Sequence, residues 1–579
     1  MDQARNSQVP ADVRKIILRS FTRKHHLQLR SDAVQFVYET VKSHGMLDDM
    51  SVVTEAVEAL AQALVDQHAS GAQASQIDSF VVTSEILQKT YDRLVVESAE
   101  SQVMPVHMQS ASVAYGDAPD RERFFHVVDA FSMPRLRFSG LRKIFQADER
   151  AASYFSTANA SNEEMRERYD LLRSIVLRNE HFLPPLAIAS GKDRESYMKL
   201  TTTKNLLGRV GESCLLFGRL STLPDGTYAL EDGEGTLPVD LTHAVSDSDL
   251  IKIAGEGIFT EGANILVEGE YMADERLRAY AIGHPPSENR EEARMHFGHI
   301  DFTGTGAVPT KHVAALRAQE MQHADSCIAV FSEVHLDHAA CMSNLRAIFQ
   351  GYQDADFLPY VIVMCGNFSS SPIDADSEQL DRYKSGFNDL ADILAGFPRL
   401  LRETHWVFVP GPDDPVTTSV LPRARIPPPL IAGFEQRLPG EYCRSRLHWA
   451  SNPCRIIYFS QEMVIFREDI MSKMLRSAVK LKHELREGDL QKYLVSSLLD
   501  QANLCPLPPP VRPILWDYAQ ALRLYPMPSV LVLADRYERF ELSYEGCHVM
   551  NPGSFRSSSF GWATYYPATG QMERSELPA

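Results

Sequence analysis

One apolar stretch decides the fold of this chain: residues 360–367 read Tyr-Val-Ile-Val-Met-Cys-Gly-Asn, and Phe368 and Ser369 follow. A short apolar run without alternation is typical of a strand that is buried on both faces of a parallel sheet. The run ends in Gly-Asn and polar residues, and ligands in such sheets gather just past the carboxyl ends of the strands. The stretch therefore predicts a central strand of an α/β domain and places candidate chemistry directly after it.

Strands and helices alternate on both sides of this stretch, and we expect an α/β layered domain over residues 291–579. Apolar runs predict strands and amphipathic segments predict helices. The other predicted strands are Cys327–Val334, Trp406–Val409, Arg455–Ser460, Met463–Arg467, Ser529–Ala534, His548–Asn551 and Gly561–Tyr566. The predicted helices are Lys311–Ala324, Ala339–Tyr352, Glu378–Ala395, Ile470–Glu487 and Leu490–Leu499.

Polar residues follow five of the predicted strands, and their spacing resembles the calcineurin-like metallophosphoesterase fold. The five clusters are Ser332-Glu333-Val334-His335, Gly366-Asn367-Phe368-Ser369, Pro410-Gly411-Pro412-Asp413-Asp414, Ala534-Asp535-Arg536-Tyr537 and Asn551-Pro552-Gly553-Ser554. In that family, Asp, Asn and His side chains at these places hold two metal ions, which clamp a phosphoryl group and generate the attacking hydroxide. The resemblance implies the family's α/β sandwich.

The match fails at the ligand positions themselves. Glu333 stands where the family has its first Asp, although His335 is retained. Asn367, a neutral amide, replaces the bridging Asp and cannot supply the negative charge that two cations need. The remaining departures are Pro412 and Asp413 in place of Asn and His, Asp414 at a position that orients its neighbours, and Asp535 and Tyr537 in place of two His. We therefore predict no catalytic, cofactor-binding or metal-ligating residues, and we interpret His335 as an ordinary surface or loop imidazole.

Residues 206–290 change to short strands separated by turn residues such as Pro224-Asp225-Gly226 and Gly233-Glu234-Gly235. Five strands with a longer connection between the third and the fourth predict a small barrel of OB type. The predicted strands are Ser213–Leu220, Tyr228–Asp232, Thr236–Leu241, Asn264–Tyr271 and Arg278–Gly283. Its turns are acidic and its strands carry few aromatic residues, so an interaction or packing module is favoured over a groove for single-stranded nucleic acid.

Residues 1–95 predict an independent N-terminal helical bundle of four helices. Apolar residues recur at helical spacing, as in Val13, Ile17 and Phe21, and Ser31 is the expected N-cap of the second helix. Residues 1–30 contain seven Lys or Arg against two Asp, and the basic face of the first helix consists of Arg14, Lys15, Arg19, Arg23 and Lys24. Such a run indicates either a solvated helix face or a docking surface for an acidic partner.

Within residues 96–205 we expect a strand in Phe124–Phe138 and a charged amphipathic helix over Glu164–Arg178. The rest is weakly patterned, and we interpret it as a connecting region that packs on its neighbours.

Composition limits the class of protein. The 579 residues include 58 Lys or Arg and 76 Asp or Glu, which gives a net charge of −18 and argues against a chain that mainly coats nucleic acid. No apolar run is long enough to span a bilayer, and we expect no membrane contact. The eight cysteines form no Cys-x-x-Cys pair, so neither a structural zinc site nor any other cofactor is expected.

An OB-type barrel followed by a phosphoesterase domain with altered ligands resembles the B subunits of replicative DNA polymerases. Several stretches are similar to the B (second) subunit of DNA polymerase epsilon in particular: residues 363–370, residues 408–415, Phe466-Arg467-Glu468-Asp469, Leu524-Tyr525-Pro526 and residues 551–555. The resemblance implies a nuclear, non-catalytic scaffold in DNA replication. It also implies that the N-terminal domain resembles the helical domain of AAA+ ATPases.

The same resemblance implies the partners. These are the C-terminal zinc-containing region of the catalytic polymerase subunit, the replicative helicase through its GINS component, which binds the N-terminal domain, and the other polymerase epsilon subunits. Any contact with DNA is expected to be indirect or weak. Two alternatives stay open: a divergent active metallophosphoesterase, and a B subunit of polymerase delta or alpha. The N-terminal bundle argues against the second, because the delta subunit lacks it and the alpha subunit has a longer leader.

Overall fold

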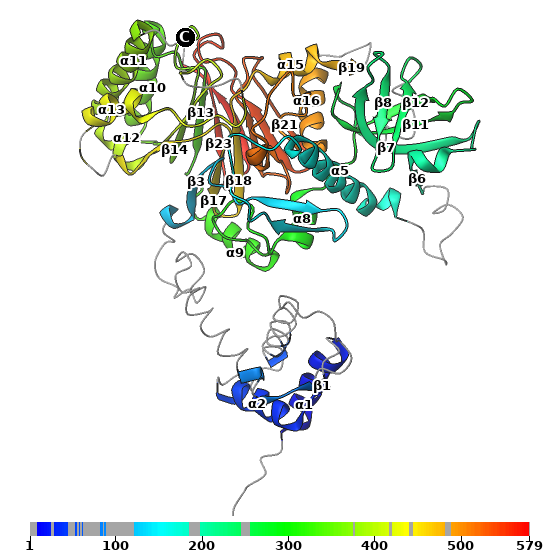
Figure 1. The fold of residues 1–579 in the computed structure, drawn as a ribbon. Helices are drawn as coiled ribbons and strands as arrows, with labels where there is room; N and C mark the ends of the chain where they lie inside the picture. Colours follow the sequence, from blue (N-terminus) through cyan, green and yellow to red (C-terminus); the bar gives the residue numbers. More distant parts are fainter. Residues whose placement is uncertain are drawn as a thin grey trace, which may run out of the picture. The chain divides into compact units, whose positions relative to one another are not determined.

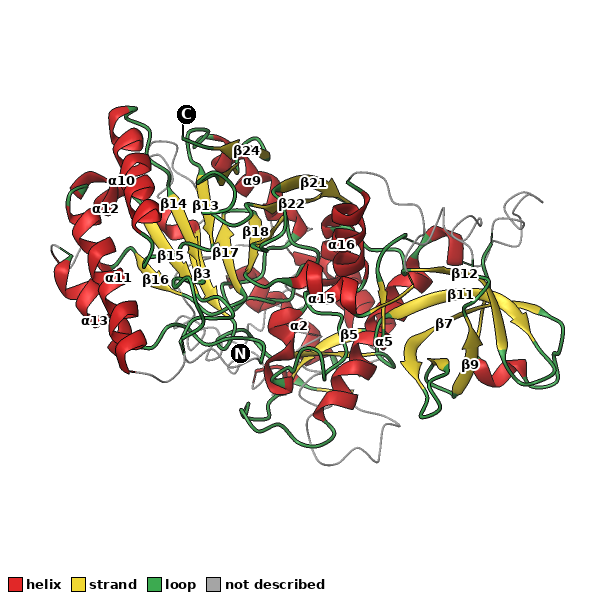
Figure 2. Cartoon of the chain, turned by 90° about the horizontal axis from the view of Figure 1, so that it is seen from above, coloured by secondary structure: helices red, strands yellow, loops and turns green. Residues whose placement is uncertain are grey.

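A computed structural model gives the fold of the chain in two compact units, Met1–Asp117 and Ala118–Ala579 (Figures 1 and 2). The structure describes residues 9–24, 28–43, 121–183, 197–244, 255–373, 377–415, 420–438, 444–480 and 488–577, and single positions between 53 and 88 and at 440. The domain boundary that the sequence placed at residue 95 lies outside the described residues.

The described part of the first unit contains two helices and a short strand pair. Helix α1 (Ala11–Leu18) continues into a π-helical turn (Arg19–Lys24), and α2 (Ser31–Ser43) follows. Strand β1 (Gln28–Leu29) pairs in parallel with β2 (Val81–Val82), a pairing that the helical pattern did not predict. The apolar faces of the helices form one core with Val13, Ile17, Phe21, Ala33, Val37, Val41, Val53 and Val57. Most of the predicted third and fourth helices lies outside the described residues.

The second unit contains a closed five-stranded barrel, as predicted. The strands are β7 (Ser213–Thr222), β8 (Tyr228–Glu231), β9 (Thr236–Asp240), β11 (Asn264–Tyr271) and β12 (Leu277–Gly283). They follow the order β7-β8-β9-β12-β11, and β11 pairs with β7 to close the barrel. Alternation fixes the two faces: Leu277 and Ala279 are buried, whereas Arg278 and Tyr280 are exposed.

Two six-stranded sheets pack face to face in the α/β domain (Figure 2). The first sheet has the order β16 (Leu447–Trp449), β15 (His405–Val409), β14 (Val361–Cys365), β13 (Ile328–Ser332), β23 (Trp562–Tyr566) and β24 (Gln571–Ser575). The second has the order β21 (Phe540–Tyr544), β22 (Cys547–Asn551), β20 (Val530–Leu533), β18 (Gln461–Phe466), β17 (Cys454–Tyr458) and β3 (Phe125–Asp129). Valine and isoleucine side chains of both sheets form the core between them.

Helices cover the outer faces of this sandwich (Figure 1). The first sheet packs against α10 (Ala339–Asp354), α11 (Ser377–Ala395), α12 (Pro398–Glu403) and α13 (Pro428–Arg437). The second sheet packs against α15 (Ile470–Arg476) and α16 (Asp489–Asp500). Two more helices, α8 (Arg290–Phe297) and α9 (Thr310–Met321), lie between the barrel and the first sheet in sequence.

Residues 96–205 are more than a connection where the structure describes them. Strand β3 is the sixth strand of the second sheet, and β4 (Leu136–Ser139) forms a hairpin with β5 (Ile144–Ala147). Helix α5 (Ala160–Arg178) packs its Tyr169 ring on Phe217 of the barrel, 5.3 Å between centroids, and β6 (Leu200–Thr201) pairs with β7. Short 3₁₀ turns complete the segment at Arg121–Phe124, Glu180–Phe182 and Thr203–Leu206; another lies at Trp516–Leu522.

One predicted helix is wrong. The helix expected over Ile470–Glu487 ends at Arg476, and Ala478–Lys480 form strand β19. This strand pairs antiparallel with β10 (Phe259–Thr260), which lies between the barrel strands β9 and β11 in the chain. Strand β10, from another domain, provides hydrogen-bond partners for the backbone of β19. An amphipathic pattern in one segment cannot reveal such a pairing. Strands β16, β21 and β24 were also missed, because they are short edge or next-to-edge strands with half-exposed side chains.

Candidate functional site

The carboxyl ends of β13, β14, β15 and β20 bring most of the predicted residues to one edge of the sandwich. Asn367 is 1% exposed and forms two hydrogen bonds with Asp413, which lies in the loop after β15. Its Nδ2 donates to Asp413 Oδ2 over 2.7 Å, and its Oδ1 accepts from Asp413 N over 2.9 Å. In this arrangement the Asn367 amide donates to a carboxylate. A second carboxylate at this position would repel Asp413 unless a cation lay between them.

Asp414 ties the same two loops together. Its carboxylate accepts from the backbone N–H groups of Phe368, over 2.8 Å, and Gly411, over 2.7 Å, and from the Tyr383 hydroxyl over 3.3 Å. Burial raises the pKa of this carboxyl to about 6 although the backbone donors favour its ionised form. Asp414 is therefore a positioning residue for the loops after β14 and β15, as the resemblance implied.

Two arginines that the sequence analysis did not single out hold the carboxylates of this edge. Arg467 is completely buried; its Nη1 lies 2.8 Å from Asp469 Oδ1 and its Nη2 lies 3.4 Å from Glu333 Oε1. Arg536 also pairs with Glu333, and its Nη2 lies 3.0 Å from Asp413 Oδ2. The guanidinium groups thus neutralise the carboxylates that would otherwise be available to metal ions.

His335 and Asp535 take no part in this network. His335 Nε2 is 3.9 Å from Glu333, both ring nitrogens lack a hydrogen-bond partner among the described residues, and burial lowers the pKa of the imidazole. His335 is 8% exposed and lies in the loop after β13, so of the two predicted settings it has the loop and not the surface one. The Asp535 carboxylate accepts from the backbone N–H groups of Met471 and Tyr537, over 2.8 and 2.9 Å, and burial raises its pKa.

The donor set does not fit a pair of divalent cations. Within the described ranges, no three His, Cys, Asp or Glu side chains gather as a metal site. Glu333 and Asp413 already contact guanidinium groups, and Asn367 brings no charge. Without cations the edge lacks a means to polarise a phosphoryl group or to generate hydroxide. The signal that could have revealed the arginines was Phe466-Arg467-Glu468-Asp469, which directly follows a predicted strand.

A second feature is the junction of the barrel with the α/β domain. Ile258 N donates to Ser497 Oγ over 2.8 Å, and the Thr260 hydroxyl donates to the carbonyl of Pro506 over 2.6 Å. All these groups are buried, and the β10–β19 pairing lies beside them. Buried hydrogen bonds at a junction of two domains favour one rigid body, since separation would leave their groups unpaired.

Comparisons with known proteins identify the family of the chain. Two family models match: the B subunit of DNA polymerases alpha and epsilon over residues 328–542, and the OB-fold domain of DNA polymerase epsilon subunit 2-like proteins over residues 158–286. DNA polymerase epsilon subunit 2 of Bos taurus is 32% identical over 95% of this chain and 96% of its own length. The chain belongs to the B-subunit family of DNA polymerase epsilon.

Two further relatives belong to the same polymerase epsilon B-subunit family. The DNA polymerase epsilon subunit 2 of Homo sapiens is 34% identical over 79% of this chain and 84% of its own length, and the B subunit of Schizosaccharomyces pombe is 34% identical over 78% and 76%. A solved archaeal phosphodiesterase covers 43% of this chain and 99% of its own, with 10% identity and a TM-score of 0.22. As a polymerase epsilon B subunit, the chain is an accessory, non-enzymatic subunit in DNA replication.

The match to the OB-fold family model begins at residue 158, just before α5, whereas the sequence pattern places the first part of the barrel at residue 206. Helix α5 and strand β6 pack on the barrel, so the physical unit and the family match agree. Among the helices of the described part of the chain, none is long and apolar enough to cross a membrane.

Proposed function

We propose that this polymerase epsilon B subunit is a scaffold with two attachment points. The joined barrel and α/β domain bind the C-terminal zinc-containing region of the catalytic subunit of polymerase epsilon, and the N-terminal unit binds GINS in the replicative helicase. The chain works in the nucleus with the other polymerase epsilon subunits, and it contacts DNA indirectly or weakly. The proposal rests on the family, to which the relatives assign an accessory role in replication.

The observation that carries the proposal is the neutralised edge of the α/β domain. Arg467 and Arg536 form ion pairs with Glu333, a carboxylate that metal ions would need as a ligand. The domain keeps its complete sandwich core. A fold that has lost its catalytic groups but kept its packing is suited to present surfaces to other proteins. We therefore propose a phosphoesterase-like domain of the calcineurin type that has no catalytic, cofactor-binding or metal site.

The N-terminal unit supports a separate attachment point. It has its own apolar core and is compact by itself. Arg14, Lys15 and Arg19 on its first helical segment are exposed, which suits contact with an acidic partner. The side chains of Arg23 and Lys24, which the sequence analysis adds to this basic face, lie outside the described residues.

Co-expression with the C-terminal region of the catalytic subunit tests the division of labour. A chain that lacks residues 1–117 should still co-purify with the catalytic subunit and should bind GINS more weakly than the full chain. Arg19→Glu should weaken binding to GINS, whereas Lys42→Glu, an exposed substitution on α2 of the same unit, is the matched control. Loss of the catalytic subunit from the truncated chain would contradict the proposal.

A further inference from the structure

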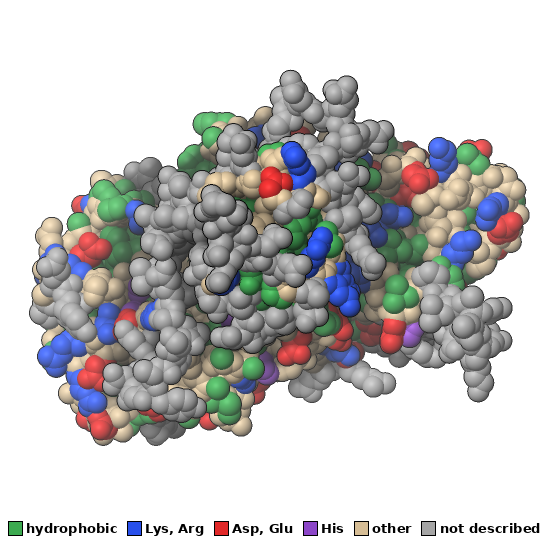
Figure 3. Space-filling view, turned by 90° about the horizontal axis from the view of Figure 1, so that it is seen from below, with side chains coloured by type: hydrophobic (Ala, Val, Ile, Leu, Met, Phe, Trp, Pro, Cys, Tyr) green, Lys and Arg blue, Asp and Glu red, His purple; other side chains and the backbone are tan. Residues whose placement is uncertain are grey.

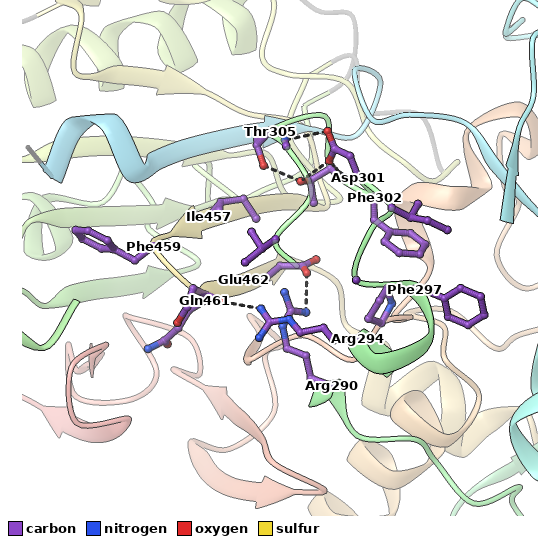
Figure 4. A pocket seen from close by; sticks show the side chains of 17 residues that line it. Arg290, Arg294, Phe297, Asp301, Phe302, Thr305, Ile457, Phe459, Gln461 and Glu462 are labelled. Atoms are coloured by element: carbon purple, nitrogen blue, oxygen red, sulfur yellow. Dashed lines mark hydrogen bonds and ion pairs between the residues drawn. The ribbon is translucent and has the colours of Figure 1, made fainter. Parts of the chain in front are cut away.

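A pocket outside the strand-end edge lies between α8, the loop of residues 298–308 and the turn that joins β17 to β18 (Figure 4). Its volume is about 550 Å³ with the open mouth included. Two arginines of α8, Arg290 and Arg294, extend side by side toward Glu462 at the start of β18. The polar edge of the phosphoesterase-like domain contributes no residue to this pocket.

The charged groups at the bottom of the pocket are unevenly paired: Arg290, Arg294, Asp301 and Glu462 line it, and only one of the two arginines forms an ion pair with a described residue. Glu462 is buried and pairs with two arginines: its Oε2 lies 2.9 Å from Arg290 Nη1, and its Oε1 pairs with Arg455. Arg294 donates to the backbone carbonyl of Ser460 over 2.9 Å. Arg290 and Arg455 therefore share one buried carboxylate, and Arg294 has no carboxylate within ion-pair distance among the described residues.

Donor groups in the pocket are left without acceptors. Arg290 Nε is buried and has no hydrogen-bond partner among the described residues. Burial, and then repulsion from Arg290, lower the pKa of Arg294 to about 10. The Arg294 side chain is half-buried and has no ion pair with a described residue, so an anion that bound beside it would gain a charge-assisted contact.

The rest of the pocket is apolar and firmly held. Phe297, Ile457 and Phe459 line its walls, and the Phe297 ring packs at 5.2 Å from Phe145 in an edge-to-face arrangement. The loop above is fixed by Asp301, whose carboxylate accepts from the backbone N–H groups of Thr303, Gly304 and Gly306 over 2.7–3.0 Å. A pocket with apolar side chains in its wall and one arginine without an ion pair to the described residues suits a ligand that has an apolar and an anionic group.

We propose that this pocket binds a carboxylate side chain of a partner protein, presented by an acidic residue that lies next to an apolar one. The planar carboxylate matches the fork of a guanidinium group and carries a single charge. A phosphate dianion is less suitable, because Glu462 and Asp301 also line the pocket and would repel its second charge. Figure 3 views the molecule from below Figure 1, and both basic and hydrophobic side chains are visible in it.

Two blocked dipeptides test this pocket in the full chain. Acetyl-Glu-Phe-amide and acetyl-Gln-Phe-amide differ only in the carboxylate, and ligand-observed NMR titration measures the binding of each. The glutamate peptide should bind about tenfold more tightly than the glutamine peptide, as expected for a bidentate charge-assisted contact. Arg294→Met should remove this preference. Arg276→Met, an exposed substitution in a barrel turn, should leave it unchanged.

Each possible result of these titrations either supports or overturns the proposal. Equal binding of the two peptides, or no binding of the glutamate peptide at millimolar concentration, would overturn the proposal. Displacement of the peptide by inorganic phosphate at a lower concentration than by acetate would also overturn it and would identify a phosphate site. Arg294→Lys keeps the charge and loses the fork, so an intermediate preference is expected from it. Unchanged thermal unfolding midpoints verify that the variants are folded. The test does not depend on which protein the scaffold binds.

Discussion

Gln501 holds both backbone hydrogen-bonding groups of Asn264. Its Oε1 accepts from Asn264 N over 2.8 Å, and its Nε2 donates to Asn264 O over 2.6 Å. The side-chain amide, which directly follows α16, thus pairs with the first residue of β11 as a neighbouring strand would. Both residues are completely buried, so this pair fixes the barrel to the α/β domain by groups that water cannot replace.

Gln501→Ala should therefore destabilise the joined body. The substitution leaves the N–H and C=O groups of Asn264 buried without partners, and we expect the free energy of unfolding to fall by about 3 kcal/mol. Urea unfolding followed by tryptophan fluorescence measures the change. Gln353→Ala, on the exposed face of α10, is the control and should change it by less than about 0.5 kcal/mol. An effect of Gln501→Ala as small as the control's would show that the junction is not held by this amide.

Asn367→Asp restores the carboxylate that the metallophosphoesterase pattern has, and it should destabilise the protein. The new oxygen would lie about 2.7 Å from Asp413 Oδ2, where the amide now donates. Repulsion raises the folded-state pKa of the new carboxyl, so the destabilisation is full above that pKa and decreases as the pH falls toward the unfolded value near ~3.9. We expect a loss of about 3 kcal/mol at pH ~8 and a smaller loss at pH ~5. Asn162→Asp, in the exposed first turn of α5, is the control.

Manganese should not rescue Asn367→Asp. Arg536 already contacts Asp413, and its guanidinium group would repel a cation bound there. The thermal unfolding midpoint of the variant should be the same with and without millimolar manganese. Elemental analysis of the dialysed wild-type chain should find no stoichiometric manganese, iron or zinc. Recovery of stability by one or two equivalents of manganese would contradict the proposed loss of the metal site.

The sequence predicted the barrel well because each of its strands is local. Alternation over Leu277–Gly283 and turn residues such as Pro224-Asp225-Gly226 mark the strands without knowledge of the rest of the fold. The sheet to which β3 belongs could not be assigned in the same way, since its partner β17 is more than 300 residues away in the chain. Helix α5 was predicted as a helix, but its contact with Phe217 depends on the tertiary structure.

At the strand-end edge, position along the chain predicted where the residues gather but not their roles. Asn367, Asp413 and Asp414 meet because parallel strands end together. Arg467 and Arg536 were overlooked because the family pattern directs attention to metal ligands, and an arginine is not one. Their role follows only from three-dimensional distances to Glu333 and Asp413.

Limited proteolysis should yield a core that begins close to residue 118 rather than at residue 206. Strand β3 pairs with β17 over five residues, from Phe125 with Tyr458 to Asp129 with Cys454, so the segment before the barrel is part of the sheet. Trypsin digestion with mass spectrometry gives the new N-terminus, and size-exclusion chromatography shows whether the pieces elute together. Early release of a free barrel would contradict a single rigid body.

His284 lies at the same junction as Gln501. The ring is completely buried and stacks on Phe259 at 4.5 Å between centroids. Its Nδ1 lies 3.1 Å from Gln501 Nε2, which must donate, and its Nε2 lies 3.2 Å from Ser497 Oγ. The neutral ring with a proton on Nε2 satisfies both contacts, whereas a second proton on Nδ1 would face a donor. Burial accordingly lowers the pKa of His284 to about 3.

This lowered pKa makes the junction sensitive to acid. In the unfolded chain a histidine has a pKa of about 6.5, so between that pH and about 3 the unfolded state binds a proton that the folded state does not. Stability is therefore lost as the pH falls, by about 2 kcal/mol between pH ~6.5 and pH ~5 from this one group. Asp500 acts in the opposite direction, because burial raises the pKa of its carboxyl, so the wild-type profile is a sum.

A comparison of variants isolates the contribution of His284 to the pH dependence of stability. His284→Asn is less stable than the wild type at pH ~7, because it loses the packed ring, but its stability should fall by about 2 kcal/mol less between pH ~6.5 and pH ~5. Urea unfolding at a series of pH values measures both profiles. His299→Asn, an exposed substitution just beyond α8, should keep the wild-type profile. If His284→Asn falls as steeply as the wild type, His284 accepts a proton in the folded junction and the hydrogen-bond assignment above is wrong.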